Sequence, residues 1–262
     1  MASELIVPPS AGPTPDRGRR TAWELVRRNL ALPIVLVVAL LALYVYLNGQ
    51  HLDEIERRLI NRHEILTLLW QHVRMVVVSS MLVILIAVPL GVLLTRRGVG
   101  WIASPLLGLS DIGQAIPSIA VLVLLLVEGH IGFWPAIIAL VLVSLLPVLR
   151  NTMVGLRGVD PALIDAARGM GLTRTSILLR VELPLAVPVM LAGLRVALIL
   201  NVASATLAAY TNAGGLGVLI ATAIPLSRYP VLITGGVLTA VLALAVDWLA
   251  GLAEQALRPR GL

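Results

Sequence analysis

The sequence contains no cysteine and no lysine, and it has only one phenylalanine. Without cysteine the chain can form neither disulfides nor thiolate metal sites, and it has no cysteine nucleophile. Without lysine it cannot carry a Walker-type phosphate loop or form a Schiff base, because both need the lysine amine. These absences exclude ATP hydrolysis by a phosphate loop and several kinds of covalent catalysis.

Charged residues are also scarce. They make up 13% of the 262 residues, whereas 58% are hydrophobic, and the mean hydropathy is +0.96. Soluble domains average roughly 45–50% apolar residues, so this excess predicts a membrane protein. All 20 basic residues are arginine, and they are scattered near the ends of apolar runs. This pattern is typical of membrane orientation and argues against nucleic-acid binding.

Apolar runs of roughly 20 residues, the length that crosses a bilayer, predict six spans. The third contains Asp111, Gln114 and Pro117, so it could form one kinked helix or two pieces. The first is long and lacks a small-residue cleavage site after it, so an uncleaved span is favoured over a signal peptide. The predicted fold is all-α, a polytopic membrane domain of about six helices. The six runs are 30–47, 73–94, 102–127, 133–150, 185–209 and 231–251.

Four regions follow from this division. Residues 1–28 are expected to be a flexible tail, and 29–72 the first span with an outer amphipathic segment on the membrane surface. Residues 73–252 are expected to form the core, with a polar insert over 151–184, and 253–262 a second tail. With six spans most arginines fall on one side, which the positive-inside rule makes cytoplasmic together with both termini.

The insert "DAARGMGLTRTSILLRVELP", Asp165 to Pro184, is a polar stretch between two long apolar runs. Asp160 and Pro161 form a good helix start, and Gly171 suits the left-handed turn that ends a helix. Thr173 can cap a second short helix, which Pro184 is expected to stop. The insert is therefore predicted to be helix, turn, helix. It serves either as a well-packed connector or as a rigid knob that docks on a soluble partner.

These residues resemble the cytoplasmic signature of permease subunits of binding-protein-dependent ABC importers. That signature reads Glu-Ala-Ala, three residues, Gly, nine residues, an aliphatic, one residue and Leu-Pro. The sequence matches it in spacing, with Asp165 in place of glutamate. The resemblance implies that the insert holds the coupling helices that sit on the ATPase. The implied coupling residues are Asp165, Ala166, Ala167, Arg168, Gly171, Leu183 and Pro184.

Other stretches, including "IGQAIPSIAVLVLLL", "LLPVLRNTMVGLRGVDPALIDAARGMGLT" and "ASATLAAYTNAGGLG", are similar to the osmoprotectant branch of these permeases, from about Gln71 onward. The resemblance implies a transmembrane subunit for glycine betaine, choline or carnitine that is not itself an enzyme. It implies ATP bound by a partner ATPase, an extracytoplasmic solute-binding protein, and a second permease chain in a homodimer or heterodimer. A permease for methionine or another small solute remains an alternative.

Charged groups inside spans are costly unless paired. Arg195 and Asp247 are hypothesised to form a structural ion pair; snorkelling of Arg195 or contact with substrate are the alternatives. The polar residues Asn201, Ser204, Thr206 and Tyr210 either hold helices together or line a translocation path. The four histidines are expected at the membrane interface, and their spacing predicts no metal site.

Two functions of other classes are alternatives to the importer. A secondary transporter would need repeat symmetry or buried carboxylate relays, neither of which the sequence displays. A membrane scaffold that only recruits a partner would explain the insert but not the polar residues of the fifth span.

Overall fold

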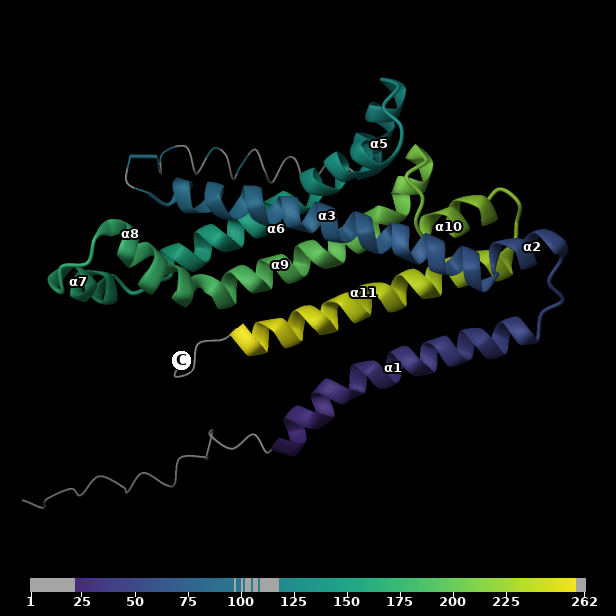
Figure 1. The fold of residues 1–262 in the computed structure, drawn as a ribbon, viewed down its shortest axis with the longest axis horizontal. Helices are drawn as coiled ribbons and strands as arrows, with labels where there is room; N and C mark the ends of the chain where they lie inside the picture. Colours follow the sequence, from purple (N-terminus) through teal and green to yellow (C-terminus); the bar gives the residue numbers. More distant parts are fainter. Residues whose placement is uncertain are drawn as a thin grey trace, which may run out of the picture.

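The computed structural model of the chain describes residues 22–96 and 118–257, together with residues 98–99, 101, 105 and 108. All the regular secondary structure in this part of the chain is helical (Figure 1). Five of its helices are long and apolar enough to cross a membrane. The predicted all-α membrane fold is confirmed. The third predicted span lies largely outside the described residues, Asp111, Gln114 and Pro117 among them, and its described remainder is α5, Ser118–Val127.

Four long helices form the core: α3 (Arg62–Leu94), α6 (Phe133–Arg157), α9 (Leu183–Ala205) and α11 (Tyr229–Leu257). Helix α6 packs against both α3 and α9, and α11 packs against α9. The interface of α3, α6 and α9 contains a buried cluster that includes Met75, Ile137, Leu140 and Val202. Interlocked side chains of this kind fix the relative positions of the three helices.

Helix α1 (Ala22–Asn48) lies apart from this core and packs along α11 (Figure 1). Within its span, from Leu30 to Asn48, only 6% of the most apolar window is buried, against 44% for α6. Apolar side chains such as Val38 and Val45 are more than half exposed. In a bilayer such a surface faces lipid or another chain.

Several helix ends differ from the predicted ones. Helix α1 includes residues 22–28 of the expected tail, and α11 continues to Leu257. The expected surface segment is divided: α2 spans Glu54–Leu59, and the rest belongs to α3. Asn61 explains the break, because its side chain accepts the N–H of Glu64 at 2.8 Å and caps the start of α3.

The shorter elements lie at the two ends of the core. The insert contains α7 (Pro161–Gly169), α8 (Arg174–Ile177) and a π-helical turn, η1 (Leu178–Glu182). At the other end, α9 runs into a 3₁₀ helix, η2 (Thr206–Thr211), which is followed by α10 (Gly217–Ala223). Figure 1 shows α7 and α8 at one end of the molecule and α2 and α10 at the other.

Candidate functional site

The first insert helix, α7, begins and ends with the residues expected from the sequence. The Asp160 carboxylate accepts the N–H of Ala162 at 2.8 Å, and Pro161 occupies the first turn. After the helix, Gly171 has a φ of +80°. Its N–H donates to the carbonyl of Arg168, and the N–H of Leu172 donates to that of Ala167. This pair of bonds is the Schellman turn that left-handed glycine makes at a helix end.

The signature residues of α7 face outward. Asp165, Ala166 and Arg168 are exposed, whereas Ala167 is buried against the rest of the insert. Arg168 and Asp165 form an ion pair of 2.8 Å one turn apart. Leu163 and Met170 are 48% and 73% exposed. The helix therefore presents a short knob with an apolar surface and a charged pair, the shape expected of a docking element.

The second insert helix does not stop at Pro184 as expected. Thr173 caps α8 by accepting the N–H of Ser176 at 3.3 Å, and the chain continues through η1 into α9 without a break. Pro184 lacks an N–H and its ring crowds the preceding turn. The π-helical turn at Leu178–Glu182 comes directly before it, and its wider spacing gives the ring room. Leu183 and Pro184 thus start the span, and the insert is rigidly joined to α9.

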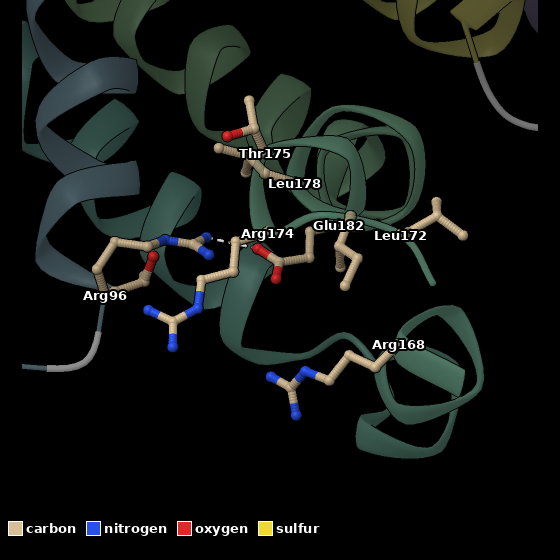
Figure 2. Close-up of a pocket in the computed structure, with 9 residues that line it drawn as sticks. Arg96, Arg168, Leu172, Arg174, Thr175, Leu178 and Glu182 are labelled. Carbon is tan, nitrogen blue, oxygen red and sulfur yellow. Dashed lines mark hydrogen bonds and ion pairs between the residues drawn. The ribbon is translucent and has the colours of Figure 1, made fainter. Parts of the chain in front are cut away.

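An ion pair fixes the insert to the end of α3. Glu182 is buried in η1, and its carboxylate accepts from the Arg96 guanidinium at 2.5 Å (Figure 2). Arg96 also donates through Nε to the carbonyl of Val92 at 3.2 Å. The contact joins two segments that are 86 positions apart, with α5 and the whole of α6 between them. It was not predicted, because Arg96 looked like one of many orientation-setting arginines.

The structure brings Arg195 of α9 together with Asp247 of α11. The guanidinium donates to both carboxylate oxygens, through Nε to Oδ1 and through a terminal nitrogen to Oδ2 at 2.7 Å. Glu254, two turns further along α11, lies 3.9 Å from the same guanidinium. This bidentate geometry gives the pair a defined orientation. It holds α9 against α11.

The polar residues predicted along the fifth span lie in different surroundings. Asn201 is fully buried: it accepts from the Ser144 hydroxyl at 2.5 Å and donates to the Ser80 hydroxyl at 2.9 Å. It therefore joins α9 to α6 and α3. Ser204 and Thr206 are half-buried, and Thr206 donates to the carbonyl of Ala203. Tyr210 is 51% exposed. Of the four, Asn201 has helix-linking contacts, and Tyr210 is the most accessible.

The expectation that all four histidines lie at the interface is wrong for His72. Its ring is fully buried; Nδ1 accepts the N–H of Leu216 at 3.2 Å, so Nε2 carries the proton and donates to the carbonyl of Val202 at 3.1 Å. The neighbouring Gln71 accepts the N–H of Gly215 at 3.0 Å. Together Gln71 and His72 hold the turn at Gly214 and Gly215, which precedes α10, against α3. Helical spacing with the buried Leu68 and Met75 was a signal that would have placed His72 inside.

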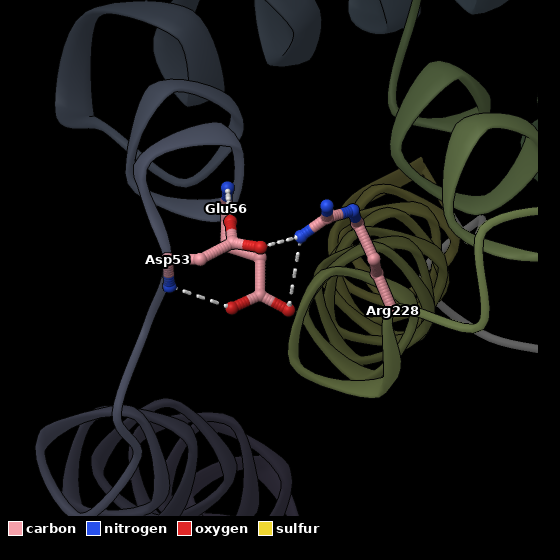
Figure 3. Close-up of polar contacts among 3 residues, drawn as sticks. All are labelled: Asp53, Glu56 and Arg228. Carbon is pink, nitrogen blue, oxygen red and sulfur yellow. Dashed lines mark hydrogen bonds and ion pairs between the residues drawn. The ribbon is translucent and has the colours of Figure 1, made fainter.

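At the end opposite the insert, three charged residues join α2 to the loop before α11 (Figure 3). Arg228 bonds to the carboxylate of Asp53 and lies 3.7 Å from that of Glu56. Asp53 and Glu56 also form a reciprocal capping box at the start of α2. Hydrogen bonding to Arg228, and then to the N–H of Glu56, holds the pKa of Asp53 below its ordinary value of 3.8.

This lowered pKa makes the contact dependent on pH. Because the folded pKa lies below the unfolded one, the stabilisation is complete above about pH 5, where both states are ionised, and is lost as the pH falls through the folded pKa. We expect Asp53→Asn, which keeps the cap, to lower the melting temperature at pH 7 and to have a smaller effect near pH 3, where this carboxyl is largely protonated in the unfolded chain. Glu54→Gln is the control, because the structure pairs Glu54 with the exposed Arg58 and not with Arg228. An equal loss for Asp53→Asn at both pH values would contradict this assignment.

The structure has no group of three or more metal-ligating side chains in the residues that it describes. What it defines is a polytopic α-helical membrane protein, with a rigid helix–turn–helix insert joined directly to one of its long helices.

Comparison with known proteins identifies the family. Residues 87–259 match the model of the binding-protein-dependent transport system inner membrane component. The chain belongs to this family of permease components of binding-protein-dependent ABC importers, whose members work with ATPase and solute-binding partners. The match covers the insert and most of the core.

Curated relatives cover most of the chain. The carnitine transport permease protein OpuCB of Listeria monocytogenes is 39% identical over 77% of this chain and 92% of its own length. The osmoprotectant import permease protein OsmW of Salmonella typhimurium is 39% identical over 80% of this chain and 100% of its own. The choline transport system permease protein OpuBB of Bacillus subtilis is 39% identical over 77% and 92%.

A solved structure has the same fold. A chain of the MetNI methionine ABC transporter, in an inward-facing conformation, aligns with a TM-score of 0.67 and 25% identity. The alignment covers 79% of this chain and 100% of the MetNI chain.

Proposed function

We propose that this chain is the permease subunit of an importer for a compatible solute such as glycine betaine, choline or carnitine. The printed names of three relatives at 39% identity support this solute class, since they are carnitine, osmoprotectant and choline permeases. The observation that carries the coupling role is the exposed α7 knob joined without a break to α9.

In the proposed orientation the insert faces the cytoplasm, where ATPase subunits bind it. Arginines gather on this side: Arg96, Arg157, Arg168, Arg174 and Arg180 lie at or near the insert end. The positive-inside rule assigns such a side to the cytoplasm. The loop that carries Arg228 and the α2 segment then face outward, where a solute-binding protein delivers its cargo.

The proposed mechanism uses the continuity of the insert with the span. When ATP closes the ATPase pair, the docked α7 knob moves with it. The Schellman turn at Gly171 and the ion pair between Arg96 and Glu182 keep the knob, α8 and the end of α3 together. Motion therefore passes along η1 into α9 and alters the cavity between this chain and a second permease chain. ATP stays on the partner, because this chain has no lysine for a phosphate loop.

The path itself is proposed to run past the accessible part of the fifth span, where Ser204, Thr206 and Tyr210 offer polar contacts. Asn201 holds this part of the fifth span in place through its hydrogen bonds to Ser80 and Ser144. Quaternary ammonium groups are held best by aromatic cages. Aromatic residues make up only 4% of the chain, so we assign most of the solute selection to the binding protein.

The coupling role is tested at Gly171. An added Cβ meets no atom within 4 Å, but the φ of +80° is unfavourable for any other residue. Gly171→Ala is expected to destabilise the turn by about 1–2 kcal/mol and to reduce both ATPase co-purification and ATP-dependent uptake of labelled glycine betaine. Gly169→Ala is the matched control, because Gly169 lies in the helix with no atom near its Cβ position.

The outcomes separate the parts of the proposal. If Gly171→Ala loses both ATPase co-purification and uptake while Gly169→Ala keeps them, coupling through the turn is supported. Equal behaviour of the two variants would contradict it. Uptake of methionine in place of betaine, choline and carnitine would leave the coupling role intact. It would show instead that the solute is methionine, which the MetNI transporter of the same fold carries.

A further inference from the structure

A cavity of about 760 Å³ lies between the end of α3 and the insert (Figure 2). Its walls come from three segments: the residues that follow α3, the end of α7 with its turn, and the α8–η1 helix. The cavity shares Arg168 with the α7 knob, but the exposed apolar side chains of the knob, Leu163 and Met170, do not line it. The lining residues are Thr95, Arg96, Arg168, Leu172, Arg174, Thr175, Ile177, Leu178 and Glu182.

The cavity is positively charged. Three arginines line it against one carboxylate, Glu182, which is already bonded to Arg96. Figure 2 shows the side chains of Arg96, Arg168 and Arg174 among those that line the pocket, with the Arg96 guanidinium directed at Glu182. Arg168 is paired with Asp165, whereas Arg174 has no ion-pair partner among the residues that the structure describes. One positive charge, that of Arg174, is thus left over beside two paired arginines, and arginine forks match phosphate oxygens well.

The cavity is also amphiphilic and lies at one end of two candidate spans. Thr95 and Arg96 directly follow the long helix α3, and Leu178 and Glu182 directly precede α9. The candidate spans are Arg62–Leu94 and Arg174–Thr211, so the cavity lies where the first one ends and the second one begins. Leu172, Ile177 and Leu178 supply an apolar wall beside the arginines. A free anion needs no apolar wall, whereas a phospholipid brings a phosphate attached to apolar carbon.

We propose that this pocket binds the phosphate headgroup of an anionic phospholipid from the leaflet on the insert side. The juxtaposition of Arg96, Arg168 and Arg174 with the apolar wall at the end of two spans carries the inference. Basic pockets between spans at the cytoplasmic surface are the kind of site that takes anionic headgroups. The cytoplasmic side rests on the orientation proposed above. A bound lipid would brace the insert against α3, next to the contact that we assign to the ATPase.

The test measures which lipid stays with the protein. The importer complex, with its ATPase, is purified into bilayer discs of phosphatidylglycerol and phosphatidylcholine in equal amounts, and bound lipid is counted by native mass spectrometry. Arg174→Gln is expected to lower the retained ratio of phosphatidylglycerol to phosphatidylcholine by about fivefold, since each arginine near a charged surface contributes about 1 kcal/mol. Arg174→Lys is expected to retain most of the preference. Arg157→Gln is the control, an exposed arginine at the end of α6 that does not line the pocket.

Three results would overturn the proposal. Equal ratios for Arg174→Gln and Arg157→Gln would mean that the pocket holds no lipid. Displacement of phosphatidylglycerol by added inorganic phosphate would assign the site to a free phosphate. Loss of the ATPase from Arg174→Gln with an unchanged lipid ratio would assign it to an acidic side chain of the ATPase. Solute uptake is measured in parallel; failure of uptake in wild type concerns the proposed transport function and leaves the lipid ratio unaffected.

Discussion

Gly217→Ala is expected to prevent accumulation of folded protein. A Cβ at Gly217 would lie 1.9 Å from the carbonyl oxygen of Thr206 and 2.6 Å from its carbonyl carbon. Both atoms belong to backbone, so no side chain can rotate to make room. Overpacking of this kind costs about 3 kcal/mol or more when the neighbour cannot move. The backbone of Gly217 has no positive φ, so the effect comes from contact alone.

The expected loss follows from what the contact holds. The N–H of Leu216 bonds to His72, and Gly217 starts α10 directly against the 3₁₀ helix. Separation of Gly217 from Thr206 would break the hydrogen bond between Leu216 and His72 and disrupt the packing of α10 against the 3₁₀ helix. We would measure the monodisperse peak of a fluorescent fusion in gel filtration before and after heating. A peak and melting temperature equal to those of wild type would refute the prediction.

Gly236→Ala is the matched control for this experiment. Gly236 is exposed within α11, and no atom lies within 4 Å of its Cβ position. Replacement of a helical glycine by alanine adds about 0.5–1 kcal/mol of stability. The two substitutions make the same chemical change in one chain, and we expect effects of opposite sign.

Neutralising one member of the pair between Arg195 and Asp247 is expected to have the second large effect. Asp247→Asn leaves the Arg195 guanidinium in the membrane with Glu254, 3.9 Å away, as its remaining carboxylate. Loss of one partner from a desolvated pair costs about 3 kcal/mol, because the other charge stays unpaired. Arg195→Gln is expected to cost a similar amount, since Asp247 is only 17% exposed.

The double variant Arg195→Gln with Asp247→Asn separates pairing from other roles. If the ion pair is structural, the double variant is expected to lose less stability than the two single variants lose in sum. Neither charge is left without its partner in the double variant. If the double variant lowers the melting temperature by the sum of the two single decreases, the structural role of the ion pair is contradicted. Loss of uptake in the double variant with full stability would instead assign Arg195 to the solute path.

Local sequence signals account for much of the insert. Asp160, Pro161, Gly171 and Thr173 act as caps or turn residues at the positions where their backbone preferences put them. Such signals act within a few residues, so they can be read without knowledge of the fold. The prediction at Pro184 was wrong because it used a local signal alone. A proline locally indicates a helix end, but the π-helical turn before it lets the helix continue.

The pairing of Arg195 with Asp247 could be hypothesised because charges in spans are rare. With few ionisable residues inside the bilayer, few combinations are available. The partners of neutral polar residues were not accessible in this way. Asn201 had many hydroxyl groups as potential partners, and only the packing of α3, α6 and α9 selects Ser80 and Ser144. The burial of His72 and the contact of Arg96 with Glu182 have the same origin.

The sequence by itself determined the all-α membrane fold, the helix–turn–helix insert and the resemblance to importer permeases. These follow from composition, the lengths of apolar runs and the spacing of residues within about 20 positions, all of which are local properties. The tertiary structure alone decided the contact of Gly217 with Thr206, the position of His72, and the arginine pocket between α3 and the insert. The last two join segments far apart in the chain, and the first depends on how two successive helices fold back on each other. Local propensities do not specify which faces of two helices meet.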